Sequence, residues 1–170
     1  MKNTLKKAAA LLLALAAVLS LAACGGKQES KVEYRDDLTT EQIADAIIAL
    51  RDDWEFVDIA PLYENYAKMA GISLEDVGEY TVRFNAAGTT ADEFGILKAK
   101  DPEKAAAIAE LGETYLKFRL EIWMDEYMPE EKPKLENAKV KVCGQYVIYA
   151  IFDDETRQQV FDAFENTLKK

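Results

Sequence analysis

The stretch KVKVCGQYVIYAIF, residues 139–152, decides the fold class. Gly144 lies near its centre, where a turn or a bulge between two strands is best made by glycine. The second half, Tyr146 to Phe152, is apolar or aromatic at every position, which is typical of a strand buried on both faces. The stretch therefore predicts two strands joined by a tight turn, with the second strand in the interior of a sheet.

Another pair of strands is predicted before it. Residues 80–85 read YTVRFN and alternate apolar with polar side chains, as a half-buried strand does. Residues 91–100 follow with the apolar cluster FGIL, after a connection that contains Gly88. We therefore expect a hairpin over 80–100 and an antiparallel sheet of four strands.

Four helices complete the prediction. The first, over 39–54, opens with the capping-box pattern of Thr39 and Gln42. The others are expected over 61–71, 101–127 and 153–168, with proline near the start of two of them. The predicted fold class is α+β, an antiparallel four-stranded sheet with the helices packed mainly on one face, in the order α-α-β-β-α-β-β-α. Residues 38–170 are expected to form this single globular domain.

The N-terminal residues predict a secretory leader. Three lysines precede the wholly apolar run Ala8–Leu19, and this run is shorter than the ~20 residues that span a bilayer. The following Leu21-Ala22-Ala23-Cys24 resembles the lipobox of bacterial lipoproteins, in which the cysteine thiol receives a diacylglyceryl group before cleavage frees its amine. We expect a lipoprotein signal peptide over 1–23, lipidation of Cys24, and a flexible tether over 24–37. The alternative is a plain secreted protein.

The charge of the mature chain limits its partners. Removal of the three leader lysines leaves 18 basic residues against 31 acidic ones, a net charge of −13. Such a chain is repelled by nucleic acid and by anionic lipid headgroups. The sequence therefore predicts no nucleic-acid partner, and a membrane association that depends on the diacylglyceryl anchor.

The composition also excludes several chemistries. The chain has no histidine, which excludes Ser-His-Asp and Cys-His catalysis as well as histidine-ligated zinc. Once Cys24 carries lipid, Cys143 has no cysteine left with which to form an intrachain disulfide. The acidic doublets lack the spacing of a calcium loop. We predict no metal site and no cofactor.

One ion pair is the main candidate for a site. Glu93 lies in a predicted strand beside apolar neighbours, and Arg119 lies on the largely apolar face of a predicted helix. A single arginine on such a face needs a carboxylate, so we expect the two to pair, although a buried Glu93 could also act as a general acid. Weaker surface candidates are Asp92, Asp125 and Tyr127.

The chain resembles a known family. The lipobox leader, ADEFGILKAKD at 91–101, and a segment from Arg119 to Asp154 that contains YMPEE, LENAKV and CGQYVIYAIFDD are similar to exported lipoproteins of Gram-positive bacteria with the domain of unknown function 4358. The resemblance covers about Leu38 to Lys170 and implies the fold and the location. It implies no activity, and Cys143 departs from the pattern of the family.

Three functions are compatible with these observations. We expect a non-catalytic binding or interaction domain at the outer face of the cytoplasmic membrane, with a membrane protein or a peptide as its partner. The first alternative is a cell-wall hydrolase that uses two carboxylates, such as Glu93 and Asp125, about 5–10 Å apart. The second is an accessory subunit of a membrane complex, which would present a large exposed apolar patch.

Overall fold

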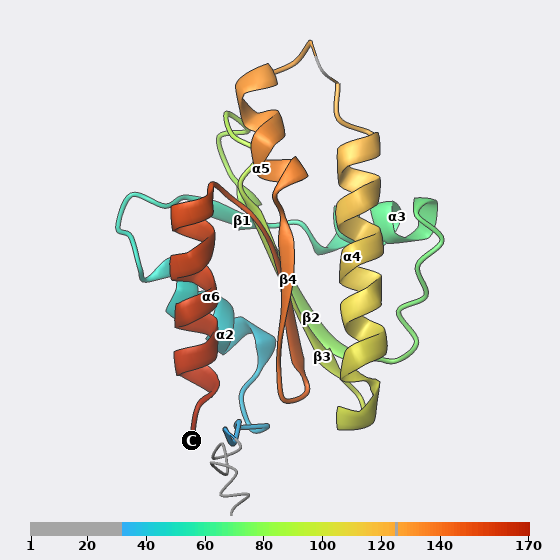
Figure 1. Cartoon of the computed structure of the whole chain (residues 1–170), viewed down its shortest axis with the longest axis vertical. Coiled ribbons are helices and arrows are strands. Elements are labelled where there is room, and N and C mark those ends of the chain that lie inside the picture. The colour runs from blue at the N-terminus through green and yellow to red at the C-terminus, as the bar shows by residue number, and fades with distance from the viewer. Residues whose placement is uncertain (1–31, 125) are drawn as a thin grey trace, which may run out of the picture. The chain divides into compact units, whose positions relative to one another are not determined.

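A computed structural model describes residues 32–124 and 126–170, which belong to one compact unit (Figure 1). No helix in these ranges is long and apolar enough to cross a membrane. The elements are α2 (Thr40–Ile48), β1 (Phe56–Asp58), α3 (Ala60–Met69), β2 (Val77–Asn85), β3 (Glu93–Ala99), α4 (Ala105–Glu121), α5 (Lys132–Glu136), β4 (Lys139–Cys143), β5 (Tyr146–Ile151) and α6 (Asp154–Leu168). Short 3₁₀ turns at Pro102–Lys104 and Pro129–Glu131 precede α4 and α5.

The sheet is antiparallel throughout, as predicted, but it has five strands rather than four. Its order is β1-β2-β3-β5-β4, so both predicted hairpins are confirmed. The additional strand is β1 at one edge, in the stretch between the first two predicted helices; Phe56 of β1 pairs with Asn85 of β2. Three residues, of which only Phe56 is half-buried, are too few to produce an alternating pattern.

The strand β5 lies inside the sheet, between β3 and β4, and all six of its residues are buried. Gly144 occupies the turn before it with a φ of +60°, the left-handed region that favours glycine. The prediction for residues 139–152 is thus confirmed.

The helices cover both faces of the sheet, and the prediction that they pack mainly on one face is wrong. In Figure 1, α2 and α6 lie on one side of the sheet, and α3 and α4 lie on the other. Alternate residues of β5 enter two separate cores: Val147, Tyr149 and Ile151 face α4, while Ile148 and Ala150 face α2 and α6. A strand that is apolar on both faces requires a layer on each, so the structure is a three-layer α/β/α arrangement.

Two helices end earlier than predicted. The capping box of α2 is present, with the amide of Gln42 donating to Thr39 Oγ1 at 3.1 Å, but this helix ends at Ile48. Trp54 lies in the loop after this helix. Its ring stacks on that of Phe152, with 5.7 Å between the two ring centroids. The long helix α4 ends at Glu121 rather than near residue 127.

Both ends of the described chain meet at one end of the unit. Residues 33–37, which we assigned to the tether, lie beside the C-terminus, where Tyr34 and Lys169 form an antiparallel bridge. The predicted leader, Cys24 and the first part of the tether lie outside the described residues.

Candidate functional site

Glu93, the first residue of β3, is a carboxylate with no exposure to solvent. Arg119 of α4 donates from Nε to Glu93 Oε2 at 3.0 Å. The hydroxyl groups of Tyr115, one turn earlier on α4, and of Tyr149 on β5 donate to Oε1 at 2.7 and 3.0 Å. The structure therefore brings together the two residues that we expected to pair and adds two tyrosine donors.

A glycine makes the tyrosine contact with β3 feasible. Gly95 lies opposite Tyr149 in the β3–β5 ladder. A Cβ atom at residue 95 would lie 2.2 Å from Cε1 of the Tyr149 ring and 2.7 Å from its hydroxyl oxygen. The ring lies across the neighbouring strand because residue 95 has no side chain, and its hydroxyl thereby reaches the carboxylate of Glu93.

Three buried tyrosines surround this carboxylate. The ring of Tyr63, from α3, lies 4.9 Å from that of Tyr115 and 6.2 Å from that of Tyr149. Burial raises the pKa of all three phenols, and the charge of Glu93 raises each further. Tyr115 and Tyr149 therefore stay protonated as hydrogen-bond donors at neutral pH.

Arg119 balances the negative charge of Glu93 and packs against α3. Burial alone would lower the pKa of Arg119. Glu93 and the nearby tyrosines have the opposite effect and raise this pKa above its ordinary value, so the guanidinium stays charged. Its Cζ lies 5.4 Å from the ring centroid of Tyr66, on α3. The carboxylate is fully buried and accepts three hydrogen bonds, so this cluster stabilises the packing of α3, α4 and the sheet.

A second cluster ties the segment before β4 to the start of β3. Lys134 on α5 places Nζ 2.8 Å from Asp92 Oδ1 and 2.8 Å from Glu131 Oε2. The backbone amide of Ala91 donates to the same oxygen of Glu131 at 2.7 Å. The three charged side chains are between 12% and 20% exposed, so Asp92 is a paired, largely buried residue.

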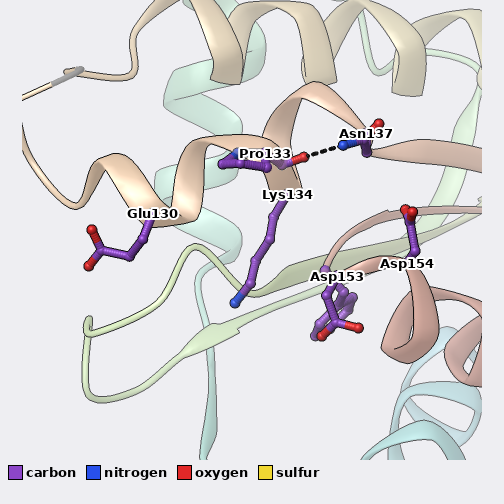
Figure 2. A pocket seen from close by; sticks show the side chains of 7 residues that line it. Glu130, Pro133, Lys134, Asn137, Asp153 and Asp154 are labelled. Carbon is purple, nitrogen blue, oxygen red and sulfur yellow. Dashed lines mark hydrogen bonds between the residues drawn. The ribbon is translucent and has the colours of Figure 1, made fainter.

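An acidic pocket opens beside this cluster, between α5 and the junction of β5 with α6. Its volume is about 260 Å³, and Figure 2 shows Lys134 extending from α5 with Asp153 across from it. It is lined by Glu130, Pro133, Lys134, Asn137, Phe152, Asp153 and Asp154. Hydrogen bonds from Thr156, at the start of α6, keep the pKa of Asp153 below its ordinary value. Lys134 is already shared by two carboxylates, and Asp154 is paired with Arg157. Glu130 and Asp153 therefore leave the wall negative, which suits a cationic group.

A second hollow lies between α3 and α4. We call it the α3–α4 groove; its volume is about 390 Å³, and it is lined by Met69, Ala70, Thr114, Lys117, Phe118 and Glu121. Met69 is 68% exposed. Leu62 and Ile122, one helical turn or more along the same two helices, are also exposed. The groove therefore combines three apolar side chains with three polar ones, and exposed apolar residues lie near it.

The remaining predicted residues contribute less. Cys24 and Asp125 lie outside the described residues. Tyr127 is exposed, with its ring 6.5 Å from that of Trp123, and it lines neither of the two hollows. No group of three or more cysteine, aspartate or glutamate side chains in the described ranges is arranged to hold a metal ion.

Sequence reasoning missed several members of both clusters. The sequence does not single out Tyr115 or Tyr149 as a donor, although Tyr115 precedes Arg119 by one helical turn, the spacing that puts two donors on one helix face. Lys134 and Glu131 fall in a proline-containing stretch without apolar periodicity, where no local signal marks a partner 40 residues away.

Comparison with known proteins identifies one family. The model of the domain of unknown function DUF4358 matches residues 62–152, more than half of the 170-residue chain. The matched segment runs from α3 to the end of β5, and it includes Glu93, Arg119, Tyr115, Tyr149 and Lys134. No curated protein and no solved structure matches the chain.

Proposed function

The chain belongs to the DUF4358 family, and from this premise we propose that it is a lipid-anchored protein at the outer face of the cytoplasmic membrane, where its folded unit acts as a non-catalytic binding domain. The observation that carries the proposal is the position of the acidic pocket. The N-terminal described residues lie beside the C-terminal end of α6, while Asp153, in the pocket, lies at its N-terminal end (Figure 1). Fifteen helical residues separate the two ends by about 22 Å.

A lipid on Cys24 would hold one end of the domain close to the membrane. Nine residue steps join Cys24 to Glu33, and they span at most about 31 Å when fully extended. The end that carries Glu33 therefore stays within about 31 Å of the lipidated residue, and the acidic pocket lies toward the opposite end of α6. This geometry presents the pocket to a membrane protein or a peptide within a few nanometres of the membrane.

The chemistry of the pocket favours a basic partner. Glu130 and Asp153 contribute carboxylates to the wall, whereas Asp154 is paired with Arg157, and the mature chain carries an expected net charge of −13. A lysine or arginine side chain of a peptide or protein would be attracted by this field and would find carboxylate acceptors.

The buried position of Glu93 opposes the hydrolase alternative. A general acid must reach the oxygen of the leaving group, whereas Glu93 is buried and already accepts three hydrogen bonds. We therefore do not assign it a catalytic role.

Site-specific crosslinking tests the proposal. A photo-crosslinking amino acid in place of Asn137, which lines the pocket and is exposed, is introduced into the full chain in cells. We expect a discrete adduct with an envelope protein or peptide. The charge reversal Glu130→Lys should remove this adduct, whereas Glu103→Lys, at an exposed position outside the pocket, should leave it. An adduct that persists in Glu130→Lys would contradict the role of the pocket.

The α3–α4 groove supports a second candidate, an accessory subunit of a membrane complex. Its exposed apolar residue Met69, next to Phe118, suits a packed protein surface better than it suits water. A photo-crosslinker at Met69 that captures a membrane protein, with none captured from Asn137, would favour this candidate.

A further inference from the structure

The segment that links the predicted anchor to the domain is bound along the lower end of the unit in Figure 1. We call residues 33–38 the strap. Its backbone pairs with the C-terminal residues: the amide of Arg35 donates to the carbonyl of Leu168 at 2.8 Å, and the amide of Lys170 donates to the carbonyl of Glu33 at 3.1 Å. The strap is thus joined to the C-terminal end of α6 by a short antiparallel bridge.

Two side chains of the sheet hold the other half of the strap. Lys98 of β3 donates from Nζ to the carbonyl oxygens of Asp36 and Leu38 at 2.8 and 3.2 Å. The hydroxyl of Tyr146, the first residue of β5, donates to the same carbonyl of Leu38 at 2.5 Å. In these hydrogen bonds, the backbone carbonyls of the strap accept from side chains of the sheet and not from its backbone amides.

The strap covers the β4–β5 turn. Tyr34 packs so closely over this turn that its Cβ lies 3.0 Å from where a Cβ of Gly144 would be. The neighbouring Cys143 is only 1% exposed. Burial, followed by the proximity of Cys143, raises the pKa of Tyr34 to about 12, and burial raises the pKa of the Cys143 thiol. The thiol is therefore shielded while the strap is in place.

The first helix does not depend on the strap for its N-terminus. Thr39 and Gln42 close the capping box of α2 between themselves, because the side chain of Gln42 accepts from the amide of Thr39 at 2.9 Å. Departure of residues 33–38 would leave this cap intact. None of the residues 33–38 is fully buried, and their contacts lie at one end of the unit, which is typical of segments that open separately from the global fold.

We propose that the strap is a conformational device: it opens as a unit, without unfolding of the domain, and so switches the linker to the membrane between a short and a long state. In the closed state the linker from Cys24 to Glu33 spans at most about 31 Å, and in the open state the chain from Cys24 to Thr39 spans about 51 Å. Opening also frees the domain to rotate on its linker. The change in reach rests on the proposed lipid anchor, whereas the opening itself does not.

The thiol of Cys143 reports the opening. The chain has two cysteines, so the full chain with Cys24→Ala has Cys143 as its one thiol. The rate of maleimide labelling is measured over a range of low urea concentrations. We expect labelling with a much weaker urea dependence than global unfolding shows, because a local opening exposes little surface. Tyr34→Ala should accelerate labelling about tenfold or more, and Tyr127→Ala, an exposed tyrosine elsewhere, should leave the rate unchanged.

A second variant keeps the test decisive if Tyr34→Ala does not fold. Lys98→Met retains an aliphatic stem beside Tyr146 and removes both bonds to the strap carbonyls, so we expect a labelling rate several times higher. Labelling of the parent chain that has the urea dependence of global unfolding, with variants that change it only as they change global stability, would overturn the proposal. Failure to find lipid on Cys24 would overturn the anchor and leave the labelling result intact.

Discussion

The ion pair of Glu93 and Arg119 allows a quantitative prediction by a double-mutant cycle. The side chains are 1% and 9% exposed, so each single change leaves an uncompensated group in the core. Glu93→Gln strands the guanidinium, and Arg119→Met leaves the carboxylate with its tyrosine donors alone. Loss of one partner of a buried pair costs about 3–5 kcal/mol in free energy of unfolding, whereas removal of both charges leaves mainly a packing loss. We therefore expect a coupling energy of about 3 kcal/mol.

Urea denaturation followed by circular dichroism measures this coupling for the full chain. The matched control is the pair Arg51 and Asp53, whose nitrogen and oxygen are 2.8 Å apart but whose side chains are 46% and 69% exposed. Its coupling should lie below about 1 kcal/mol. A coupling energy for Glu93 and Arg119 no larger than that of this control would refute the reasoning that the burial of the pair, and not only its short distance, determines the coupling energy.

Three further changes follow from the same structure. Gly95→Ala should lower the free energy of unfolding by about 3 kcal/mol or more, because its Cβ would overlap the Tyr149 ring, and Gly112→Ala, with a nearest distance of 3.2 Å to Val140, should cost far less in the same denaturation experiment. Lys134→Met should cost about 1–2 kcal/mol because Asp92 and Glu131 lose their shared cation, and Lys139→Met, on an exposed residue, should be nearly neutral. Lys141 and then Lys169 lower the pKa of Glu165 from 4.5 to about 2, so its contribution is complete above about pH 4.5 and is lost as the pH falls toward 2. Glu165→Gln should therefore destabilise the protein by about 1 kcal/mol at pH 7 and by almost nothing at pH 2, and a constant difference across this range would contradict the assignment.

The sequence predicts the strands that carry strong patterns and misses the one that does not. Residues 80–85 alternate and residues 146–152 are continuously apolar, and both form strands. The edge strand at Phe56–Asp58 has a single half-buried side chain, so its position depends on pairing with β2 and on the ring contacts of Phe56. The second helical layer is not predicted, although β5 is apolar on both faces, because antiparallel sheets commonly leave one face in contact with water.

The ion pair was predictable because a charge on an apolar face needs a partner. The tyrosine donors were not, since Tyr149 reaches Glu93 only through the β3–β5 register that sets Gly95 beneath its ring. The acidic pocket depends on α5 lying against the start of α6, a tertiary contact between segments whose own sequences show no common pattern.

Mass spectrometry of the N-terminal peptide tests the central claim, a lipid-anchored binding domain, most directly. Trypsin cuts after Lys27, so a mature lipoprotein yields the peptide CGGK, residues 24–27, with Cys24 at its N-terminus. We predict that this peptide from membrane-extracted protein carries a diacylglyceryl group on the thiol of Cys24. Recovery of the peptide Ala8–Lys27 without modification, or of CGGK with a free thiol, would contradict the anchor and the closeness to the membrane that rests on it.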